Sequence, residues 1–325
     1  MIGRRVVLAG AAILAAPAVR AQSFPDRPLR LVVAFPPGGN VDFTARLLAP
    51  ALSAALGQPV VVDNRPGAAG IVGTESGARA RPADGHVLLL GSTGPLALFP
   101  VAMPSVPYDT LRDLAPVGIA YQVPIVVMVA PGVRARALPE FVALAKATRG
   151  GMSAGTSGIG SGAHLTIELL NASAGTGLIH VPYRGTGPAL NDLIGGTIPC
   201  VFDQLSNALP LHADGRARII GVTSAARSPL LPEVGTFREA GLIEPELSTT
   251  LGLLATAGTP PAAVDRLRAA LVATMADATV RGRLTELGGV IPPAEGITPA
   301  RYAEVIREET EVNRRAVQLG NIRLE

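Results

Sequence analysis

Tryptophan is absent from the 325-residue sequence, and aromatic side chains make up 3% of it. A binding site built on stacking platforms for sugars or nucleic acid bases is therefore not expected, and a small aliphatic or singly aromatic ligand fits better. Cysteine occurs once, as Cys200, which excludes an intramolecular disulfide and any metal site made of several thiolates. We expect Cys200 to be a small buried side chain.

Lysine is scarce too, and the motifs of the common nucleotide-binding and hydrolytic enzymes are missing. Lys146 is the only lysine, and no Gly-Lys-Ser/Thr occurs, so the sequence has no P-loop. Residues 154–160 partly match a dinucleotide-binding loop, but the spacing differs and residues 174–176 lack the acidic ribose partner. Gly-x-Ser-x-Gly and His-Glu-x-x-His are also absent. No cofactor is expected, and a triad assembled from distant residues stays open as the enzymatic alternative.

The N-terminus has the three parts of an export signal. Arg4 and Arg5 form a basic start, residues 6–16 an unbroken apolar run, and residues 19–21 a small-residue cleavage site before Gln22. The apolar run has about half of the roughly 20 residues that a membrane-spanning helix needs. We therefore predict that residues 1–21 are a signal peptide, removed on export by the Sec or the twin-arginine route, and that the mature protein is periplasmic.

The charge balance argues against nucleic acid as a partner. The formal net charge of +3 falls to zero when Arg4, Arg5 and Arg20 leave with the signal peptide. The remaining charges are interspersed along the chain, whereas phosphate backbones are bound by clustered basic surfaces.

The mature chain, of about 300 residues, is long enough for two domains. Short apolar runs alternate with glycine-rich turns and amphipathic helical stretches, which is typical of α/β domains with parallel sheets. We expect residues 22–123 and 226–325 to form a discontinuous lobe 1 and residues 124–225 to form lobe 2. Strands are predicted at residues 29–35, 60–62, 87–90, 125–129, 153–154, 179–181, 200–202 and 219–223, and helices at 43–56, 260–275 and 299–319.

The segment PPGGNVD at residues 36–42 joins a predicted strand to the start of a helix. Backbone N–H groups at a helix start lack partners inside the helix and carry the positive end of its dipole, so they suit an anion. Two glycines let a ligand approach the backbone closely. The candidate binding residues are Pro37, Gly38, Gly39, Asn40 and Asp42, and the alternative is an ordinary βα turn that Asp42 caps.

A second loop, AGTSGIGSGAH at residues 154–164, also follows a predicted strand and opens a helix. Four glycines and three hydroxyl side chains make it rich in hydrogen-bond donors, although a flexible loop without a ligand is the alternative. Because each predicted lobe contributes one such helix start, we expect both to face a shared anion-binding cleft. The candidate residues are Thr156, Ser157, Gly158, Gly160, Ser161 and His164.

Several long motifs in this sequence resemble those of one receptor family, the Bug proteins of tripartite tricarboxylate transporters. The resemblance extends over essentially the whole mature chain. The matching segments are residues 24–28 (FPDRP), 36–39 (PPGG), 57–68 (GQPVVVDNRPGA), 82–85 (PADG), 180–185 (HVPYRG), 252–255 (GLLA) and 257–260 (AGTP).

The resemblance implies a type II periplasmic-binding-protein-like fold, in which two α/β lobes enclose a ligand cleft. It implies a carboxylated ligand, held largely by backbone amides and bridging waters, and the subunits of a membrane permease as partners. Ser92 and Thr93 match a hydroxyl-bearing strand end of the family, and Asp203 matches an acidic position often near the ligand.

The sequence departs from the family pattern in three places. Thr250 and Leu251 stand where relatives often carry an aromatic pair, His86 replaces a usual tyrosine, and Gln204 replaces a common asparagine. The first departure is expected to reshape the cleft. The adjacent Tyr183 and Arg184 have two interpretations, since this turn either fastens the domain or contacts the ligand.

We therefore expect a solute-binding receptor that delivers a small carboxylate to a permease, with a periplasmic ligand sensor as the alternative and a hydrolase as a third. Since Lys146 is the only lysine, backbone N–H groups or an arginine must neutralise the anion. If Asp203 faces the cleft, it repels a second carboxylate and favours a hydroxy, amino or aromatic monoacid over citrate.

Overall fold

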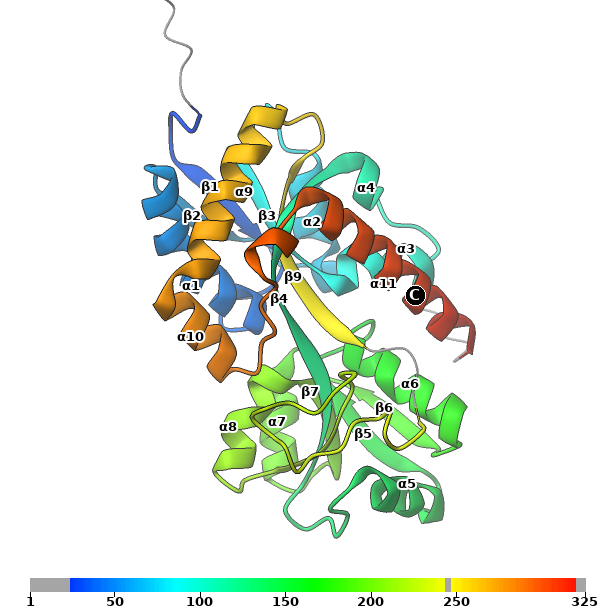
Figure 1. Ribbon diagram of the computed structural model, residues 1–325. Coiled ribbons are helices and arrows are strands. Elements are labelled where there is room, and N and C mark those ends of the chain that lie inside the picture. The colour runs from blue at the N-terminus through cyan, green and yellow to red at the C-terminus, as the bar shows by residue number, and fades with distance from the viewer. Residues whose placement is uncertain (1–23, 243–246, 320–325) are drawn as a thin grey trace, which may run out of the picture.

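The computed structural model describes residues 24–242 and 247–319, which form two α/β lobes joined by long strands (Figure 1). The strands are β1 (Leu29–Val33), β2 (Val60–Asn64), β3 (Val87–Ser92), β4 (Leu114–Val129), β5 (Met152–Thr156), β6 (Leu178–Pro182), β7 (Cys200–Gln204), β8 (Arg218–Val222) and β9 (Ser248–Thr256). The helices are α1 (Asn40–Leu56), α2 (Ile71–Ala78), α3 (Phe99–Ala102), α4 (Thr110–Asp113), α5 (Leu138–Ala147), α6 (Gly162–Ala174), α7 (Thr186–Ile194), α8 (Leu205–Ala213), α9 (Pro261–Ala276), α10 (Ala278–Glu286) and α11 (Pro299–Leu319). Three single turns are η1 (Ala68–Gly70), η2 (Gly94–Leu98) and η3 (Ala294–Gly296).

The strands form one continuous path in the order β2-β1-β3-β9-β4-β7-β5-β6, with β8 paired to β4. Strand β4 belongs to both lobes, because its first part pairs with β9 up to Pro124, and its last part, from Ile125, pairs with β7 and β8. The pairs β1–β2, β1–β3, β5–β6 and β5–β7 are parallel, as predicted. All pairings of β4 and β9 are antiparallel, which the expectation of parallel sheets did not include.

The change of partner at Pro124 supports the proposed entry into lobe 2 at this point. Residues after 226 still pack on lobe 2, which favours a return to lobe 1 later than the expected residue 226. Val222 forms backbone hydrogen bonds with Gly235 and Phe237, and Phe237 is buried with the side chains of β5 and β7. We therefore propose that the chain returns to lobe 1 through β9.

In each lobe, helices cover both faces of the strands (Figure 1). Leu31 and Val33 of β1 pack under α1, while the intervening Val32 packs on the opposite face with the side chains of α2 and α11. Burial on both faces explains why the strands appear in the sequence as unbroken apolar runs instead of alternating patterns.

Helix α11 contacts both lobes. Its residues Tyr302 and Ile306 pack in lobe 1, whereas Ala316 belongs to the buried cluster that includes Leu165 of α6. The helix approaches β9 closely at Gly252, where a Cβ atom would lie 2.6 Å from the Tyr302 ring. Among the described residues, no helix is long and apolar enough to cross a membrane.

Candidate functional site

The first candidate loop connects β1 to α1, and residues 36–39 are exposed. Gly38 has a φ of +89°, which favours glycine, and Gly39 is the N-cap of α1 in an extended conformation. The Gly39 carbonyl accepts a hydrogen bond from the N–H of Phe43, so the helix starts three residues earlier than predicted. Among the described residues, none accepts from the N–H groups of Gly39, Asn40 or Val41. These three donors are available to an anion.

Asp42 fixes the position of this loop through hydrogen bonds. Its buried carboxylate accepts hydrogen bonds from the N–H of Gly38 at 2.9 Å, Nε of Arg46 at 3.0 Å and Nδ2 of Asn64 at 2.9 Å. Burial raises the pKa of Asp42, but the bonds from Arg46, Gly38 and Asn64 outweigh burial and hold that pKa below its ordinary value. Asp42 was expected among the ligand-binding residues; because its oxygens accept these hydrogen bonds from the protein, we propose that it fixes the loop instead.

Asn40 joins lobe 1 to lobe 2. Its Nδ2 donates to Oε1 of Gln204 at 2.5 Å, and its Oδ1 accepts from the Tyr121 hydroxyl at 2.7 Å. Gln204 in turn donates to Oγ1 of Thr249 on β9 at 3.2 Å. Gln204 is therefore a bridging residue between the lobes, although the sequence marked it only as a departure from the family pattern.

Ser92 and Thr93, at the end of β3, lie against β9. Ser92 is buried and pairs with Leu251, and Oγ1 of Thr93 accepts from the N–H of Thr250 at 2.8 Å. Thr93 therefore helps to fasten β9. Beyond it, a Cβ atom on Gly94 would lie 3.7 Å from the Gly160 carbonyl oxygen, so this end of lobe 1 meets the second candidate loop.

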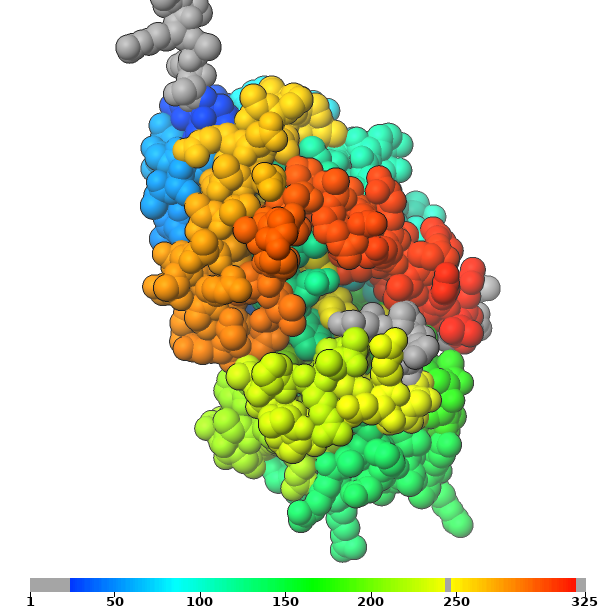
Figure 2. Space-filling view, viewed as in Figure 1, coloured from blue at the N-terminus to red at the C-terminus, as the bar shows by residue number. Residues whose placement is uncertain are grey.

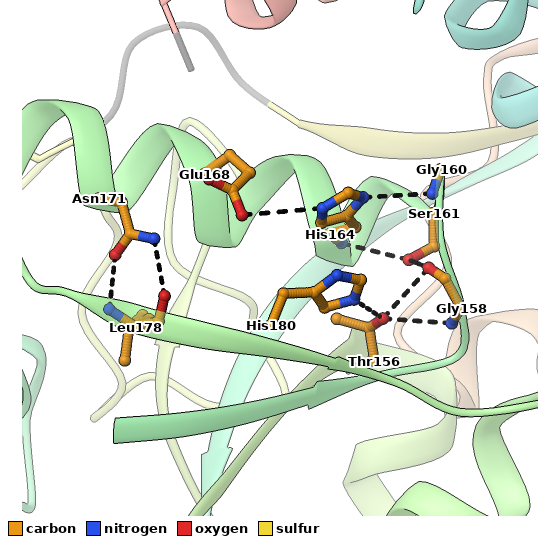
Figure 3. Close-up of polar contacts among 9 residues, drawn as sticks. All are labelled: Thr156, Gly158, Gly160, Ser161, His164, Glu168, Asn171, Leu178 and His180. Carbon is orange, nitrogen blue, oxygen red and sulfur yellow. Dashed lines mark hydrogen bonds and ion pairs between the residues drawn. The ribbon is translucent and has the colours of Figure 1, made fainter. Parts of the chain in front are cut away.

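The second loop connects β5 to α6 and is held by its own side chains (Figure 3). Oγ1 of the buried Thr156 accepts from the N–H of Gly158 at 3.1 Å and lies 2.7 Å from Nε2 of His180. Ser161 is the N-cap of α6, since its Oγ accepts from the N–H of His164 at 3.1 Å and donates to the Gly158 carbonyl at 2.9 Å.

Three groups of this loop remain available to a ligand. The Ser157 hydroxyl and the N–H groups of Gly162 and Ala163 have no hydrogen-bond partner in the part of the chain that the structure describes. The two amides are the first in α6, where the helix dipole is positive. This arrangement matches that of the first loop.

His164 is occupied within the loop. Its Nδ1 accepts from the N–H of Gly160 at 3.2 Å, and its Nε2 lies 3.7 Å from Oε1 of Glu168. Its ring stacks on that of His180 with 3.8 Å between centroids (Figure 3). Burial lowers the pKa of His164 to about 4, and burial together with the nearby His164 lowers the pKa of His180 to about 4. We assign His164 to the support of the loop instead of direct ligand contact.

Asp203 is 3% exposed and bound to its own lobe. Its Oδ1 accepts from the N–H of Gln204 at 2.7 Å, and both oxygens lie 3.4 Å from Nδ2 of Asn207. Burial raises its pKa to about 6. This placement removes the reason for expecting Asp203 to repel a second ligand carboxylate, because the carboxyl is turned into the starts of the neighbouring helices.

A polar chain that the sequence did not indicate crosses the strands between the lobes. Nε2 of Gln122 on β4 donates to Oγ1 of Thr250 at 2.9 Å, and Thr250 donates to the carboxyl of Glu309 on α11. Burial raises the pKa of Glu309 to about 7. The face shown in Figure 2 is hollowed between the lobes, with atoms of β4 and β9 at the bottom.

The other notable residues are structural. Tyr183 donates to Asp192 of α7 at 2.7 Å, which favours the fastening role for its turn. His86 lies between Asp26 and Asp84, at 3.0 and 3.1 Å. Cys200 is buried, as predicted. Within residues 24–242 and 247–319, no group of His, Cys, Asp and Glu is placed to hold a metal ion.

A family model described as a tripartite tricarboxylate transporter family receptor matches residues 44–318. The chain is 39% identical to the protein BugT of Bordetella pertussis over 262 residues, which cover 80% of this chain and 79% of BugT.

Two solved structures from Rhodopseudomonas palustris are similar over almost their whole length. MatC with bound malate is 32% identical with a TM-score of 0.83, and the match covers 90% of this chain and 100% of MatC. A second R. palustris protein, solved with adipate, is 30% identical with a TM-score of 0.85, over 92% of this chain and 99% of the other.

Proposed function

Since the chain belongs to the tripartite tricarboxylate transporter receptor family, which includes the Bug proteins, we propose that it captures a small carboxylate in the periplasm and delivers it to a membrane permease. Its relatives are solute-binding proteins, and those solved with malate and adipate carry carboxylates. The observation that carries the proposal is the pair of helix starts with unoccupied amides, one in each lobe.

The proposed ligand contacts are the N–H groups of Gly39, Asn40 and Val41 in lobe 1, and those of Gly162 and Ala163 with the Ser157 hydroxyl in lobe 2. Backbone dipoles suit this task because their orientation costs no side-chain entropy when the ligand binds. The turn at Pro37 and Gly38 and the Thr156–Ser161 loop shape the approach to these donors. In this arrangement one anionic group lies between the two helix starts.

The proposed ligands include dicarboxylic acids as well as monoacids. The preference for a monoacid depended on Asp203 facing the ligand, and the buried carboxyl of Asp203 bonds to Gln204 instead. The malate and adipate of the two R. palustris proteins are both dicarboxylates.

A thermal-shift screen of organic acids tests the proposed function. Ligand at a hundredfold its dissociation constant stabilises the native state by about 2.7 kcal/mol, so a matching acid should raise the melting temperature clearly. The panel comprises malate, adipate, citrate and aromatic monoacids, each paired with its neutral amide. We expect at least one acid, and none of the amides, to shift the melting temperature. Equal shifts by amides or by sugars would contradict the carboxylate proposal.

Export is tested separately, because residues 1–23 lie outside the described part of the chain. We expect the secreted form to begin at Gln22, which N-terminal sequencing of periplasmic protein determines. A full-length chain retained in the membrane fraction would instead show that the apolar segment is an anchor.

A further inference from the structure

The stacked imidazoles of His164 and His180 hold the second loop at two points. His164 comes from the first turn of α6 and accepts from the N–H of Gly160 at 3.2 Å, while His180 comes from β6 and lies 2.7 Å from the Thr156 hydroxyl. The rings are 3.8 Å apart with 15° between their planes (Figure 3). Each residue contacts a different end of the segment that we propose to bind the ligand.

The hydrogen bond from Gly160 determines the protonation state of His164. Since the N–H of Gly160 is a donor, Nδ1 of His164 must be unprotonated and act as the acceptor. The proton of the neutral ring then resides on Nε2, which faces Glu168 at 3.7 Å. A second proton on Nδ1 would replace the acceptor with a donor and break the bond to Gly160.

The residues around His164 and His180 supply little negative charge to stabilise the two rings in their protonated form. Glu168 is the carboxylate next to His164, and burial raises its pKa, so it takes up a proton more readily than an exposed glutamate does. Of the strands that pack on α6, β5 has no titratable side chain, β6 has only His180 itself, β4 has only Tyr121, and β7 has Cys200 and the buried Asp203. Helix α11 also packs on α6 and carries acids and bases together, namely Arg301, Tyr302, Glu304, Arg307, Glu308, Glu309, Glu311, Arg314 and Arg315.

We propose that the neutral, stacked His164 and His180 position the loop of residues 156–161 for ligand binding, and that protonation of the pair releases this loop. The proposal rests on the proposed function, because it assumes that this loop contacts the carboxylate. Two imidazolium rings at this separation repel each other, and His164 loses its acceptor at the same time. The low pKa of both rings, caused by burial, keeps the pair neutral down to about pH 5.

The first measurement needs no ligand. Amide exchange of Gly160, read by NMR as a protection factor, should drop by about tenfold in His164→Phe, which keeps a stacking ring but removes the acceptor. His164→Asn offers an amide oxygen near the position of Nδ1 and should keep most of the protection. In the unmodified protein the same protection should fall as the pH drops from about 5 to about 3, through the His164 pKa of about 4.

His212 provides a matched control. Its Nδ1 accepts from the N–H of Ile219 at 3.1 Å, but none of the described aromatic rings stacks on it. His212→Phe should therefore affect Ile219 and leave Gly160 unchanged. If His164→Phe retains full protection of Gly160, or if the pH profile of the variant equals that of the unmodified protein, the proposal is refuted.

The second measurement uses malate and adipate as probes in calorimetric titrations at about pH 7.5 and pH 3.5, on either side of the histidine pKa of about 4. We expect a probe that binds at the higher pH to bind at least about tenfold more weakly at the lower pH. The double variant His164→Asn/His180→Gln keeps only the pH dependence that comes from protonation of the acids themselves, so its affinity should fall at least about tenfold less than that of the unmodified protein between the two pH values. An unchanged pH dependence would contradict the proposal, whereas binding of neither probe would count against the proposed function and leave the exchange result to decide the role of the pair.

Discussion

Gly39→Val is expected to abolish the stabilisation of the protein by its carboxylate ligand while leaving the fold intact. A Cβ atom at Gly39 would meet only the Pro36 carbonyl oxygen, at 3.9 Å, and the φ of −84° and ψ of 171° suit any residue. The added side chain therefore costs little in the free protein. It lies where the ligand must approach the N–H groups of α1, so it excludes the anion from these donors.

Differential scanning fluorimetry with and without the acid selected by the screen measures this effect. The ligand-dependent gain of about 2.7 kcal/mol at a hundredfold the dissociation constant should vanish in the variant. Gly132→Val is the control, because Gly132 lies in the turn after β4, at the far end of lobe 2, with no atom within 4 Å of an added Cβ. A Gly39→Val protein that still responds to the acid would show that this helix start does not hold the ligand.

Gly158 is a less suitable position for the same test. Its φ is +144°, and an added Cβ would lie 3.2 Å from the Tyr183 carbonyl, so substitution strains the loop before any ligand is considered. Loss of binding in a Gly158 variant could come from loop strain or from a blocked ligand site. Loss of binding in Gly39→Val could come only from the blocked site.

Glu309→Gln is expected to stabilise the protein at alkaline pH and to have little effect in acid. Burial raises the folded-state pKa of Glu309 from 4.5 to about 7, and its hydrogen-bond partners Thr250 and Thr93 are neutral. The folded state therefore binds a proton that the unfolded state has released, and stability falls as the pH rises from about 4.5 through 7. At about 1.4 kcal/mol per pH unit, the ionised carboxylate costs about 3 kcal/mol above pH 7.

Urea unfolding at about pH 5 and pH 8 tests this expectation. The variant should be more stable than the unmodified protein by about 2 kcal/mol at the higher pH and nearly equal to it at the lower pH. Glu308→Gln on the same helix is the control, since its side chain is 52% exposed and pairs with Arg301 at the surface, and a change below about 1 kcal/mol is expected. A loss of stability in Glu309→Gln at the higher pH would show that the ionised form is favoured instead.

The histidine pair has the opposite pH dependence. His164 and His180 have folded-state pKa values lowered from 6.5 to about 4, so the unfolded chain takes up their protons first and stability falls as the pH drops from about 6.5 to 4. Glu309 and Asp203, whose pKa values are raised, favour the folded state over the same acidic range. Substitutions of the two histidines and of Glu309 therefore measure separately two opposite pH dependences of stability, which partly cancel in the unmodified protein.

Much of the fold was predictable because its determinants are local. The run at residues 29–33 forms a strand, the helix after it ends at Gly57 with a φ of +74°, and the C-terminal helix occupies residues 299–319 as predicted. Strand β9 and the first part of β4 were missed. Their apolar residues are buried by partners more than a hundred residues away, and no short-range pattern marks them as the antiparallel strands between the lobes.

The same distinction applies to the candidate site. A strand followed by glycines and a helix start is visible in sequence, so both loops with free amides could be identified in advance. The direction in which a side chain points could not be identified from the sequence. Asp203 and Gln204 are neighbours on β7, yet Asp203 turns into lobe 2 and Gln204 reaches Asn40 in lobe 1, because successive side chains of a strand point to opposite sides.

The sequence by itself determined the family, the two helix starts suited to an anion and the absence of thiolate or lysine chemistry, since each depends on residue type and short spacing. Only the tertiary structure decided that Asn40 and Gln204 connect the lobes, that His164 stacks on His180, and that Glu309 lies beside Thr250. Each of these contacts joins segments that are brought together by the packing of separate strands and helices. The free energy of such a contact depends on burial and on neighbours that the local sequence does not contain.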